Sequence, residues 1–339
     1  MYNRNVYKYD EMKRTEHMAV RNTVGWYLWT HQLLEVTGED AAAFMDKIFA
    51  NPIANLKIGS DRYTTMLNEN AEILDDVVIF RMEEQRFWIS TLFLTKLIRW
   101  LNDHKGEYKV EFNNIASQYQ MYAVQGPRAK DLINAMVENN VDEQRFFTIR
   151  DNKIDGINVK INRGGFTGEK CGYEIYVASS DMQIVESKLR ECGKQFGAVE
   201  VTEFQIMAWT LPTEAGFYYM RDLMHTNPLE VGLDRGIGWD KDFIGKEALL
   251  KIKEQGPARE MVGFTMDEDD ARINPKNLGG PGTAVMLNDE EIGRVSKFVY
   301  SFVTEKNIGY ILARKGVVKP GDHVTINSYD TVITDKVFI

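Results

Sequence analysis

Three short segments of the chain repeat their apolar residues at the spacing of a helix. Residues 39–49 bring alanine, phenylalanine, methionine and isoleucine side chains to one face. Residues 127–137 do the same and begin with Pro127, whose fixed φ suits a first helical turn. Residues 245–254 form the third segment, which the Gly-Pro pair at 256–257 ends. The pattern therefore predicts three short amphipathic helices.

Strand patterns surround these helices. Runs of apolar residues predict strands at 73–80, 108–113, 119–125, 158–163 and 173–178, and a hairpin at 286–295 with N-D-E-E as its turn. Little helical periodicity follows residue 260, so we expect the rest of the chain to form a separate β domain. Before that point helices and antiparallel-looking strands mix irregularly, which favours an α+β fold over a doubly wound α/β sheet.

Length and composition narrow the class of protein. At 339 residues the chain is too long for one ordinary core, so we expect two or three domains. Its apolar runs fall far short of the roughly 20 residues that span a bilayer, and its N-terminus is too polar for a secretory signal. Two cysteines, Cys171 and Cys192, cannot build a disulfide framework or a cysteine-rich metal site. We therefore expect a cytoplasmic protein without a membrane partner or a bound metal.

The net charge is −9, and the chain contains no long cluster of lysine and arginine. Proteins that bind nucleic acids need a basic footprint on their surface. We therefore exclude DNA and RNA as expected partners. An anionic small ligand stays possible, since it needs only a few locally placed basic residues.

A glycine-rich stretch, N-R-G-G-F-T-G-E-K-C-G-Y-E-I-Y-V at 162–177, is the first candidate site. It does not fit a Walker A loop, because Glu169 follows the glycine where lysine is required and no hydroxyl comes next. It does not fit a dinucleotide-binding fingerprint either, since a strand and not a helix follows the glycines. Cys171 has no neighbouring histidine or second cysteine, so a thiol site is not indicated.

The carboxylate in this stretch is the more informative residue. Glu174 lies in an otherwise apolar and aromatic strand, and alternation places it on the same face as Tyr176. A carboxylate beside an aromatic ring can bind a planar heterocycle that presents two adjacent N–H donors, such as a pterin or a guanine. The alternative is a solvent-facing strand glutamate with no ligand.

Two aspartates interrupt a second apolar strand. Asp75 and Asp76 lie between Ile73-Leu74 and Val77-Val78, and because side chains alternate, one of them must point inward. A functional carboxylate and a strand-start cap are both consistent with this pattern. We favour Asp75 as the chemical group and Asp76 as the structural one, although alternation does not decide between them. His31, in W-T-H-Q, is a candidate acid, with a structural core histidine as the alternative.

Six blocks of sequence extend over nearly the whole chain. They are R-T-E-H-M-A-V-R-N-T-V-G-W-Y-L-W-T-H at 14–31, R-Y-T-T-M-L-N-E-N-A-E-I-L-D-D at 62–76, Y-A-V-Q-G-P-R-A at 122–129, G-G-F-T-G-E-K-C-G-Y-E-I at 164–175, T-E-A-G at 213–216 and P-L-E-V-G-L…D-K-D-F-I-G-K-E-A-L at 228–249. In this order they resemble the T-protein (aminomethyltransferase) family of tetrahydrofolate-dependent one-carbon transferases.

The resemblance implies a three-domain α+β arrangement around a central folate site, with a C-terminal β domain. We assign residues 1–49 and 117–205 to the first domain, 50–116 and 206–255 to the second, and 256–339 to the third. The implied cofactor is tetrahydrofolate.

By the same resemblance, Glu174 would hold the pterin edge and Tyr176 would line the pocket. One of the two aspartates would lie beside the reactive folate nitrogens. We also expect Tyr63 and Trp209 to contact the cofactor.

The chain departs from the family pattern where the glycine-cleavage enzymes carry an Arg-Asp pair and a further arginine. Ala208, Trp209 and Pro212 stand at those places, and the Thr-Ser-Gly of the third domain has become S-K-F at 296–298. Trp209 and Phe298 suggest a more apolar donor site.

We therefore expect a demethylase-type enzyme that moves a methyl or one-carbon group from a small O-, S- or N-methylated donor to tetrahydrofolate. A lipoyl carrier protein is not an expected partner. The alternatives are the glycine-cleavage aminomethyltransferase itself and a non-enzymatic, folate-binding assembly factor.

Overall fold

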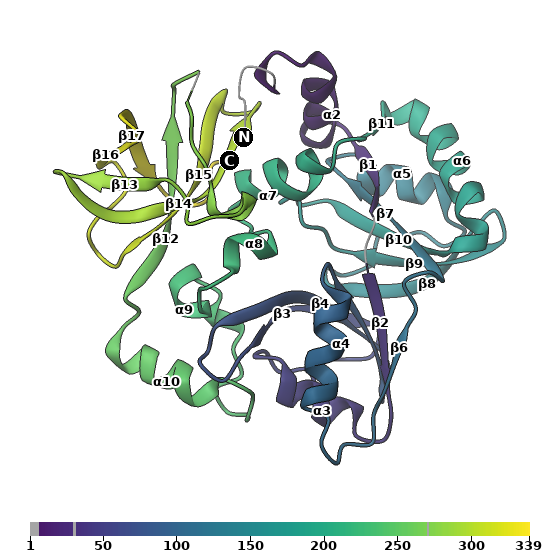
Figure 1. The fold of residues 1–339 in the computed structure, drawn as a ribbon. Coiled ribbons are helices and arrows are strands. Elements are labelled where there is room, and N and C mark those ends of the chain that lie inside the picture. The colour runs from purple at the N-terminus through teal and green to yellow at the C-terminus, as the bar shows by residue number, and fades with distance from the viewer. Residues whose placement is uncertain (1–6, 30–31, 270) are drawn as a thin grey trace.

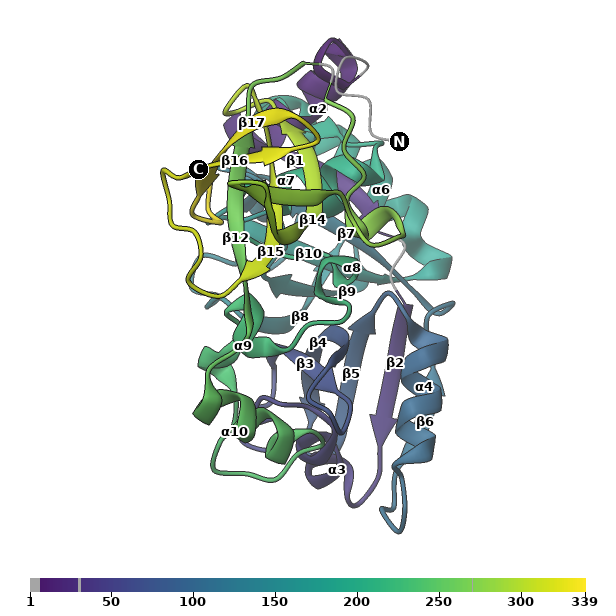
Figure 2. The same cartoon turned by 60° about the vertical axis from the view of Figure 1, so that its left-hand side comes forward.

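The computed structural model describes residues 7–29, 32–269 and 271–339 of the chain. The described elements form two bodies, an eleven-stranded sheet with flanking helices and a closed six-stranded barrel (Figure 1). The barrel comes from the C-terminal part of the chain and lies beside the sheet, as Figure 2 shows from a second direction. In the part described, no helix is both long enough and apolar enough to cross a membrane.

The sheet has the order β11-β1-β7-β10-β9-β8-β3-β4-β5-β2-β6. Its strands are β1 (Gly25–Trp29), β2 (Gln32–Thr37), β3 (Ser60–Leu67), β4 (Ile73–Glu83), β5 (Arg86–Thr91), β6 (Glu111–Asn114), β7 (Tyr119–Gln125), β8 (Thr148–Ile154), β9 (Ile157–Arg163), β10 (Gly172–Ala178) and β11 (Val199–Glu200). Strands β1 and β11 pair in parallel, and β1 pairs with β7 in the antiparallel sense.

The helices flank the sheet or connect it to the barrel. They are α2 (Glu11–Asn22), α3 (Ala41–Ile48), α4 (Leu94–Asp103), α5 (Ala129–Met136), α6 (Met182–Gly193), α7 (Leu211–Glu214), α8 (Met220–Leu223), α9 (Pro228–Val231) and α10 (Lys246–Gln255), with a π-helical turn η3 (Ile206–Thr210) directly before α7. Short 3-10 turns are η1 (Ser179–Asp181), η2 (Lys194–Phe196), η4 (Asp234–Gly236) and η5 (Lys276–Leu278).

The sheet consists of two halves that meet where β3 contacts β8, at the residue pair Ser60 and Thr148. Helices α5 and α6 pack on the half that contains β7 and β10, and α3 and α4 pack on the half that contains β4 and β5. In α4, the buried residues Leu94, Leu97 and Leu101 recur at helical spacing, so one stripe of the helix covers the sheet. Each half therefore has its own apolar core, and the seam between them runs through the middle of the sheet.

The barrel has the strand order β12-β15-β14-β13-β16-β17 and closes where β17 pairs with β12. Its strands are β12 (Arg259–Met266), β13 (Ala284–Leu287), β14 (Glu290–Ser301), β15 (Lys306–Arg314), β16 (His323–Ile326) and β17 (Tyr329–Thr334). The hairpin between β13 and β14 turns at Asn288 and Asp289, which have φ angles of 50° and 64°. Both values suit a two-residue turn of the I′ type, so the turn is shorter than the four-residue N-D-E-E turn expected from sequence.

The segment after η3 anchors the sheet body to the barrel. The Tyr310 hydroxyl on β15 donates to the backbone oxygens of Thr213 (3.1 Å) and Phe217 (2.9 Å). The backbone N–H of Phe338 donates to the Glu214 carbonyl oxygen at 2.8 Å. These bonds fix the Glu-Ala-Gly turn against the barrel wall.

The expected α+β fold with a C-terminal β domain is confirmed, and α3, α5 and α10 lie where the three helical patterns predicted them. The division into three domains remains a proposal. Residues 32–48, which we assigned to the first domain, form β2 and α3. Strand β2 pairs with β5 and β6 in the second half of the sheet, and α3 packs in the core of the same half.

Candidate functional site

Glu174 lies on β10 and is nearly buried, with 7% of the residue exposed. Its Oε2 accepts hydrogen bonds from Asn162 Nδ2 at 3.0 Å and from the Tyr176 hydroxyl at 3.2 Å. Burial raises the pKa of Glu174, and the two hydrogen bonds oppose this change. Glu174 and Tyr176 thus share a face of the strand, as alternation predicted, and no described residue donates to Glu174 Oε1.

A second carboxyl group lies close to Glu174 across the seam of the sheet. Asp61, on β3, is 5% exposed, and burial together with the negative charge of Glu174 raises its pKa to about 8. Asp61 Oδ2 and Asn162 Oδ1 are both buried without a hydrogen-bond partner among the described residues. Buried polar atoms are normally paired, so these two oxygens mark a candidate ligand site.

The two aspartates of β4 have different surroundings. Asp75 is 1% exposed, and its carboxylate accepts from the Thr91 hydroxyl at 2.7 Å and from the backbone N–H of Asp76 at 3.0 Å. Asp76 is half-buried on the opposite face, where the Tyr63 hydroxyl donates to its Oδ2 at 2.9 Å. Tyr63 is 37% exposed, so this face is open to a ligand.

The pKa values of both aspartates are raised. Burial and the charge of Asp76 raise the pKa of Asp75 to about 7. Burial and the charge of Asp222 raise the pKa of Asp76 to about 6, while the hydrogen bond from Tyr63 and the charge of Lys297 lower it. Asp76 is therefore able to exchange a proton near neutral pH.

Lys297 and Asp222 form a buried ion pair that sequence reasoning missed. Lys297 Nζ lies 2.6 Å from Asp222 Oδ2, and both side chains are fully buried. Burial lowers the pKa of Lys297 and raises that of Asp222, and their mutual contact opposes both changes. The backbone N–H of Tyr219 also donates to Asp222 Oδ2 at 2.9 Å, whereas Asp222 Oδ1 has no partner in the described ranges.

The remaining predicted site residues fall into three cases. Trp209 is half-buried beside Tyr219, with ring centroids 6.1 Å apart, and its indole N–H is buried without a partner among the residues described. Phe298 belongs to the barrel core, where its ring stacks on Phe264 at 6.1 Å, so our expectation that it shapes an apolar donor site is wrong. His31 lies outside the described residues.

The donors and acceptors near Glu174 suit a planar heterocycle such as a pterin. Glu174 Oε1 and Asn162 Oδ1 are open acceptors. Trp209, which packs against the same apolar cluster as Tyr176, supplies an aromatic face and an N–H without a partner among the described residues. Asp76 and Tyr63 add a proton-exchanging pair. This chemistry fits the tetrahydrofolate that the sequence implied, with an edge to be recognised and nitrogens that gain and lose protons.

The glycine-rich stretch forms a turn that packs on Gln125. A Cβ atom on Gly165 or Gly172 would lie 2.1 or 2.4 Å from the Gln125 amide oxygen, so both positions require glycine. Gln125 in turn donates to the Gly164 carbonyl oxygen and accepts from the Thr167 hydroxyl at 2.9 Å. The turn therefore leads the chain into β10 and fixes the position of Glu174.

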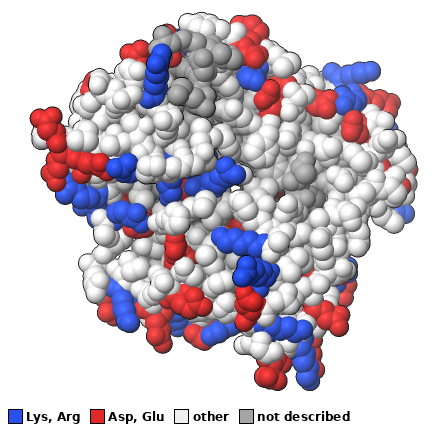
Figure 3. Space-filling view, in the orientation of Figure 1, with Lys and Arg blue, Asp and Glu red and all other residues white. Residues whose placement is uncertain are grey.

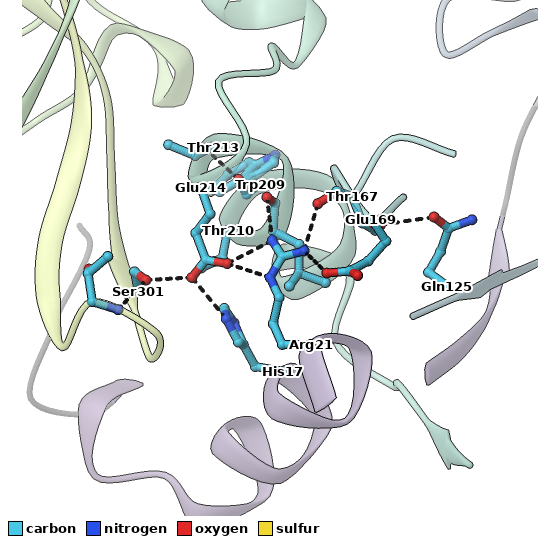
Figure 4. A network of polar contacts seen from close by, with 12 residues as sticks. His17, Arg21, Gln125, Thr167, Glu169, Trp209, Thr210, Thr213, Glu214 and Ser301 are labelled. Atoms are coloured by element: carbon cyan, nitrogen blue, oxygen red, sulfur yellow. Dashed lines mark hydrogen bonds and ion pairs between the residues drawn. The ribbon is translucent and has the colours of Figure 1, made fainter. Parts of the chain in front are cut away.

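A further buried carboxylate, Glu214, lies at the centre of a polar network between α2, the glycine-rich turn and the barrel (Figure 4). Its oxygens contact His17 Nε2 at 2.9 Å, Arg21 at 2.7 and 2.9 Å, and the Ser301 hydroxyl. Arg21 also donates to Glu169 and to the Thr167 carbonyl oxygen. Burial raises the pKa of Glu214, but His17 and Arg21 outweigh it, and the pKa lies below its ordinary value.

The sequence held signals for the residues that were missed. Lys297 interrupts the apolar run V-S-K-F-V-Y. Asp61 precedes Tyr63 by two positions in a strand, so alternation places the side chains of Asp61 and Tyr63 on one face. A charged residue inside an apolar strand is the signal that identified Asp75 and Asp76. Glu214 gave no such signal, because Thr-Glu-Ala-Gly reads equally well as a helix end.

Comparisons with known proteins agree over most of the chain. The family model for the GCVT N-terminal domain matches residues 1–241, and that for the glycine cleavage T-protein C-terminal barrel domain matches residues 259–338. An aminomethyltransferase of Thermoanaerobacter sp. (strain X514) is 33% identical over 320 residues, which cover 92% of this chain and 84% of the relative. One of Alkaliphilus oremlandii (strain OhILAs) is 34% identical over 309 residues, covering 88% and 80%.

The crystal structure of the glycine cleavage system aminomethyltransferase T from Bartonella henselae has the same fold. It superposes with a TM-score of 0.82, covering 96% of this chain and 88% of that one at 22% sequence identity.

Proposed function

We propose a function from the premise that this chain belongs to the glycine cleavage T-protein family and is a tetrahydrofolate-dependent one-carbon transferase. Within that family, we propose that it transfers an aminomethyl-type one-carbon unit to tetrahydrofolate. The observation that carries the proposal is the pair of sites on one molecule, a carboxylate with an open oxygen at Glu174 and a proton-exchanging carboxylate at Asp76.

Two observations favour an aminomethyltransferase over the demethylase that we expected from the sequence. The relatives that match over most of the chain are named aminomethyltransferases. The apolar donor site rested on Trp209 and Phe298, and Phe298 packs inside the barrel. The residue beside it, Lys297, forms a buried ion pair and its charge acts on Asp76, so that side of the site is more polar than the sequence suggested.

Because the chain is an enzyme, the non-enzymatic assembly factor is dropped.

Glu174 would bind the pterin edge through its open Oε1 while Asn162 and Tyr176 hold Oε2. A carboxylate held from behind by two hydrogen bonds presents its other oxygen in a fixed direction, which favours a charge-assisted contact with ring N–H groups. Tetrahydrofolate, when bound, supplies the nucleophilic nitrogens that accept the one-carbon unit.

Asp76 is our proposed chemical residue, in place of Asp75. Its carboxylate faces Tyr63 on the open side of β4, and its pKa of about 6 lets it hold or release a proton near neutral pH. Asp75 is directed into the core of the second half of the sheet, and its carboxylate accepts a hydrogen bond from Thr91. We therefore propose that Asp75 stabilises the strand. Lys297 would favour the ionised form of Asp76.

A methyl donor remains the second candidate, and one observation favours it. Ala208 and Pro212 stand where the resemblance led us to expect arginines, and Trp209 presents an aromatic ring there. A site with fewer positive groups and more aromatic surface suits a small methylated donor.

The products of the two reactions distinguish the candidates. The protein is incubated with tetrahydrofolate and either an aminomethylated lipoyl carrier protein or a panel of methylated phenols, thioethers and amines. Aminomethyl transfer yields methylenetetrahydrofolate and ammonia, whereas methyl transfer yields 5-methyltetrahydrofolate, and mass spectrometry separates them. We expect methylenetetrahydrofolate. Formation of 5-methyltetrahydrofolate alone would establish the second candidate, and neither product from any donor would contradict both.

A further inference from the structure

Asp61 is buried beside Glu174 without an interaction that compensates for its burial. It is 5% exposed, its Oδ2 has no hydrogen-bond partner, and no ion pair with a described lysine or arginine involves it. An isolated charged carboxylate would be very costly to bury in this way. The position needs either a proton on Asp61 or a ligand, and the structure argues for both.

Of the two neighbouring carboxyl groups, Asp61 and Glu174, Asp61 is the one whose surroundings favour the protonated form. Glu174 and Tyr176 approach from β10, and on β4 the residue paired with Asp61 is the apolar Phe80. Two carboxylates without a cation between them do not both ionise at neutral pH. Glu174 is stabilised as an anion by Asn162 and Tyr176, whereas Asp61 accepts nothing comparable. Asp61 is therefore a neutral carboxylic acid, which is a hydrogen-bond donor.

A neutral acid beside an ionised one presents one donor and one acceptor to the same ligand edge. The corresponding edge of a pterin carries a carbonyl oxygen at position 4, next to the ring N–H and the 2-amino group. We propose that Asp61 is a second pterin-recognition residue, whose O–H donates to the 4-oxo oxygen while Glu174 accepts from the adjacent N–H groups. This inference rests on the proposed role of Glu174.

The arrangement has a consequence for the pH dependence of binding. The pKa of Asp61 is about 8, so its O–H donor is lost as pH rises through that value, and affinity for the ring should fall with it. Loss of the contact with the 4-oxo oxygen should weaken binding by about tenfold.

The test measures equilibrium binding of tetrahydrofolate by calorimetry under anaerobic conditions. The wild type is compared with Asp61→Ala and Asp61→Asn between pH 7 and pH 9. The wild type should lose affinity towards pH 9. Asp61→Ala should bind tetrahydrofolate about tenfold more weakly than the wild type at pH 7. Asp61→Asn keeps an N–H donor and does not titrate, so it should bind tetrahydrofolate well and lose the extra pH dependence.

Ionisation of the ligand itself affects all three proteins alike, so only the difference between them is interpreted. Thermal melting checks that each variant is folded, and the isosteric Asn variant carries the test if the Ala variant is not. An Asp61→Ala protein that binds tetrahydrofolate as the wild type does, or wild-type and Asn proteins with the same pH profile, would overturn the inference. A folded wild type that binds no tetrahydrofolate would overturn the proposed function itself.

Discussion

The protein buries carboxylates in two regions, and the two differ in how well their oxygens are paired. Glu214 contacts His17, Arg21 and the Ser301 hydroxyl, and its pKa is lowered (Figure 4). Around the proposed folate site, Glu174, Asp61 and Asp76 have raised pKa values, and neighbouring oxygens lack partners. A fully paired carboxylate stabilises the fold, whereas an incompletely paired one is kept for a ligand or a proton.

The same distinction separates the buried groups from the charges on the surface. On the face that Figure 3 shows, acidic and basic side chains are interspersed, and most carry little information about function. The side chains that carry information about function are those buried away from water. The following predictions test whether pairing really separates structural from functional carboxylates, beginning with the largest expected effect.

Asp76→Asn should lower the rate of one-carbon transfer by about 10²–10⁴-fold and leave tetrahydrofolate affinity nearly unchanged, because the amide keeps the size but cannot exchange a proton. Asp75→Asn is the matched control on the neighbouring position. It should lower the melting temperature and leave the rate per folded molecule near that of the wild type. Single-turnover kinetics and thermal melting check both variants, and the reverse pattern would return the chemical role to Asp75.

Glu214→Gln should lower the free energy of unfolding by about 3–5 kcal/mol, since Arg21 and His17 lose the anion that holds them in the interior. The lowered pKa of Glu214 means that its stabilisation is present above its unfolded pKa and is lost as pH falls through the folded value. The difference between wild type and variant should therefore shrink in acid. Denaturant unfolding at pH 7 and at pH 3–4 measures it, and a variant as stable as the wild type at pH 7 would refute a structural role.

Glu174→Gln should weaken tetrahydrofolate binding by about 30-fold to 1000-fold, because the charge-assisted contact is lost while the side chain keeps its size. Glu111→Gln, at an exposed glutamate on the edge strand β6, is the control and should bind like the wild type. Calorimetry measures the tetrahydrofolate affinity of both variants and of the wild type. Equal affinity for the two variants would show that Glu174 is an ordinary strand glutamate.

Lys297→Met should shift the acid limb of the pH–rate profile to higher pH, since the positive charge of Lys297 lowers the pKa of Asp76. Lys297→Arg keeps the charge and should shift it less. Asp222→Asn is the converse variant: it removes the negative charge that raises the pKa of Asp76, so it should shift the acid limb to lower pH. Because each single variant leaves the other member of the ion pair buried without its partner, thermal melting checks that both are folded. Unchanged acid limbs in both folded variants would show that the ion pair has no influence on Asp76.

The sequence determined the features that repeat locally along the chain. The helical patterns gave α3, α5 and α10, and the six blocks gave the fold and the cofactor. Strand alternation put Glu174 and Tyr176 on one face, and the structure joins them by a hydrogen bond. Such features follow from the periodicity of side-chain directions in a helix or a strand, which is a property of the backbone alone.

Only the tertiary structure decided which groups meet. Asp75 and Asp76 both have apolar neighbours in sequence, and their roles separated only when Thr91 was found on one face of β4 and Tyr63 on the other. The contacts of Glu214 with Arg21 and of Asp222 with Lys297 join positions 193 and 75 residues apart. Burial and charge pairing depend on distances between distant segments, and local periodicity contains no information about those distances.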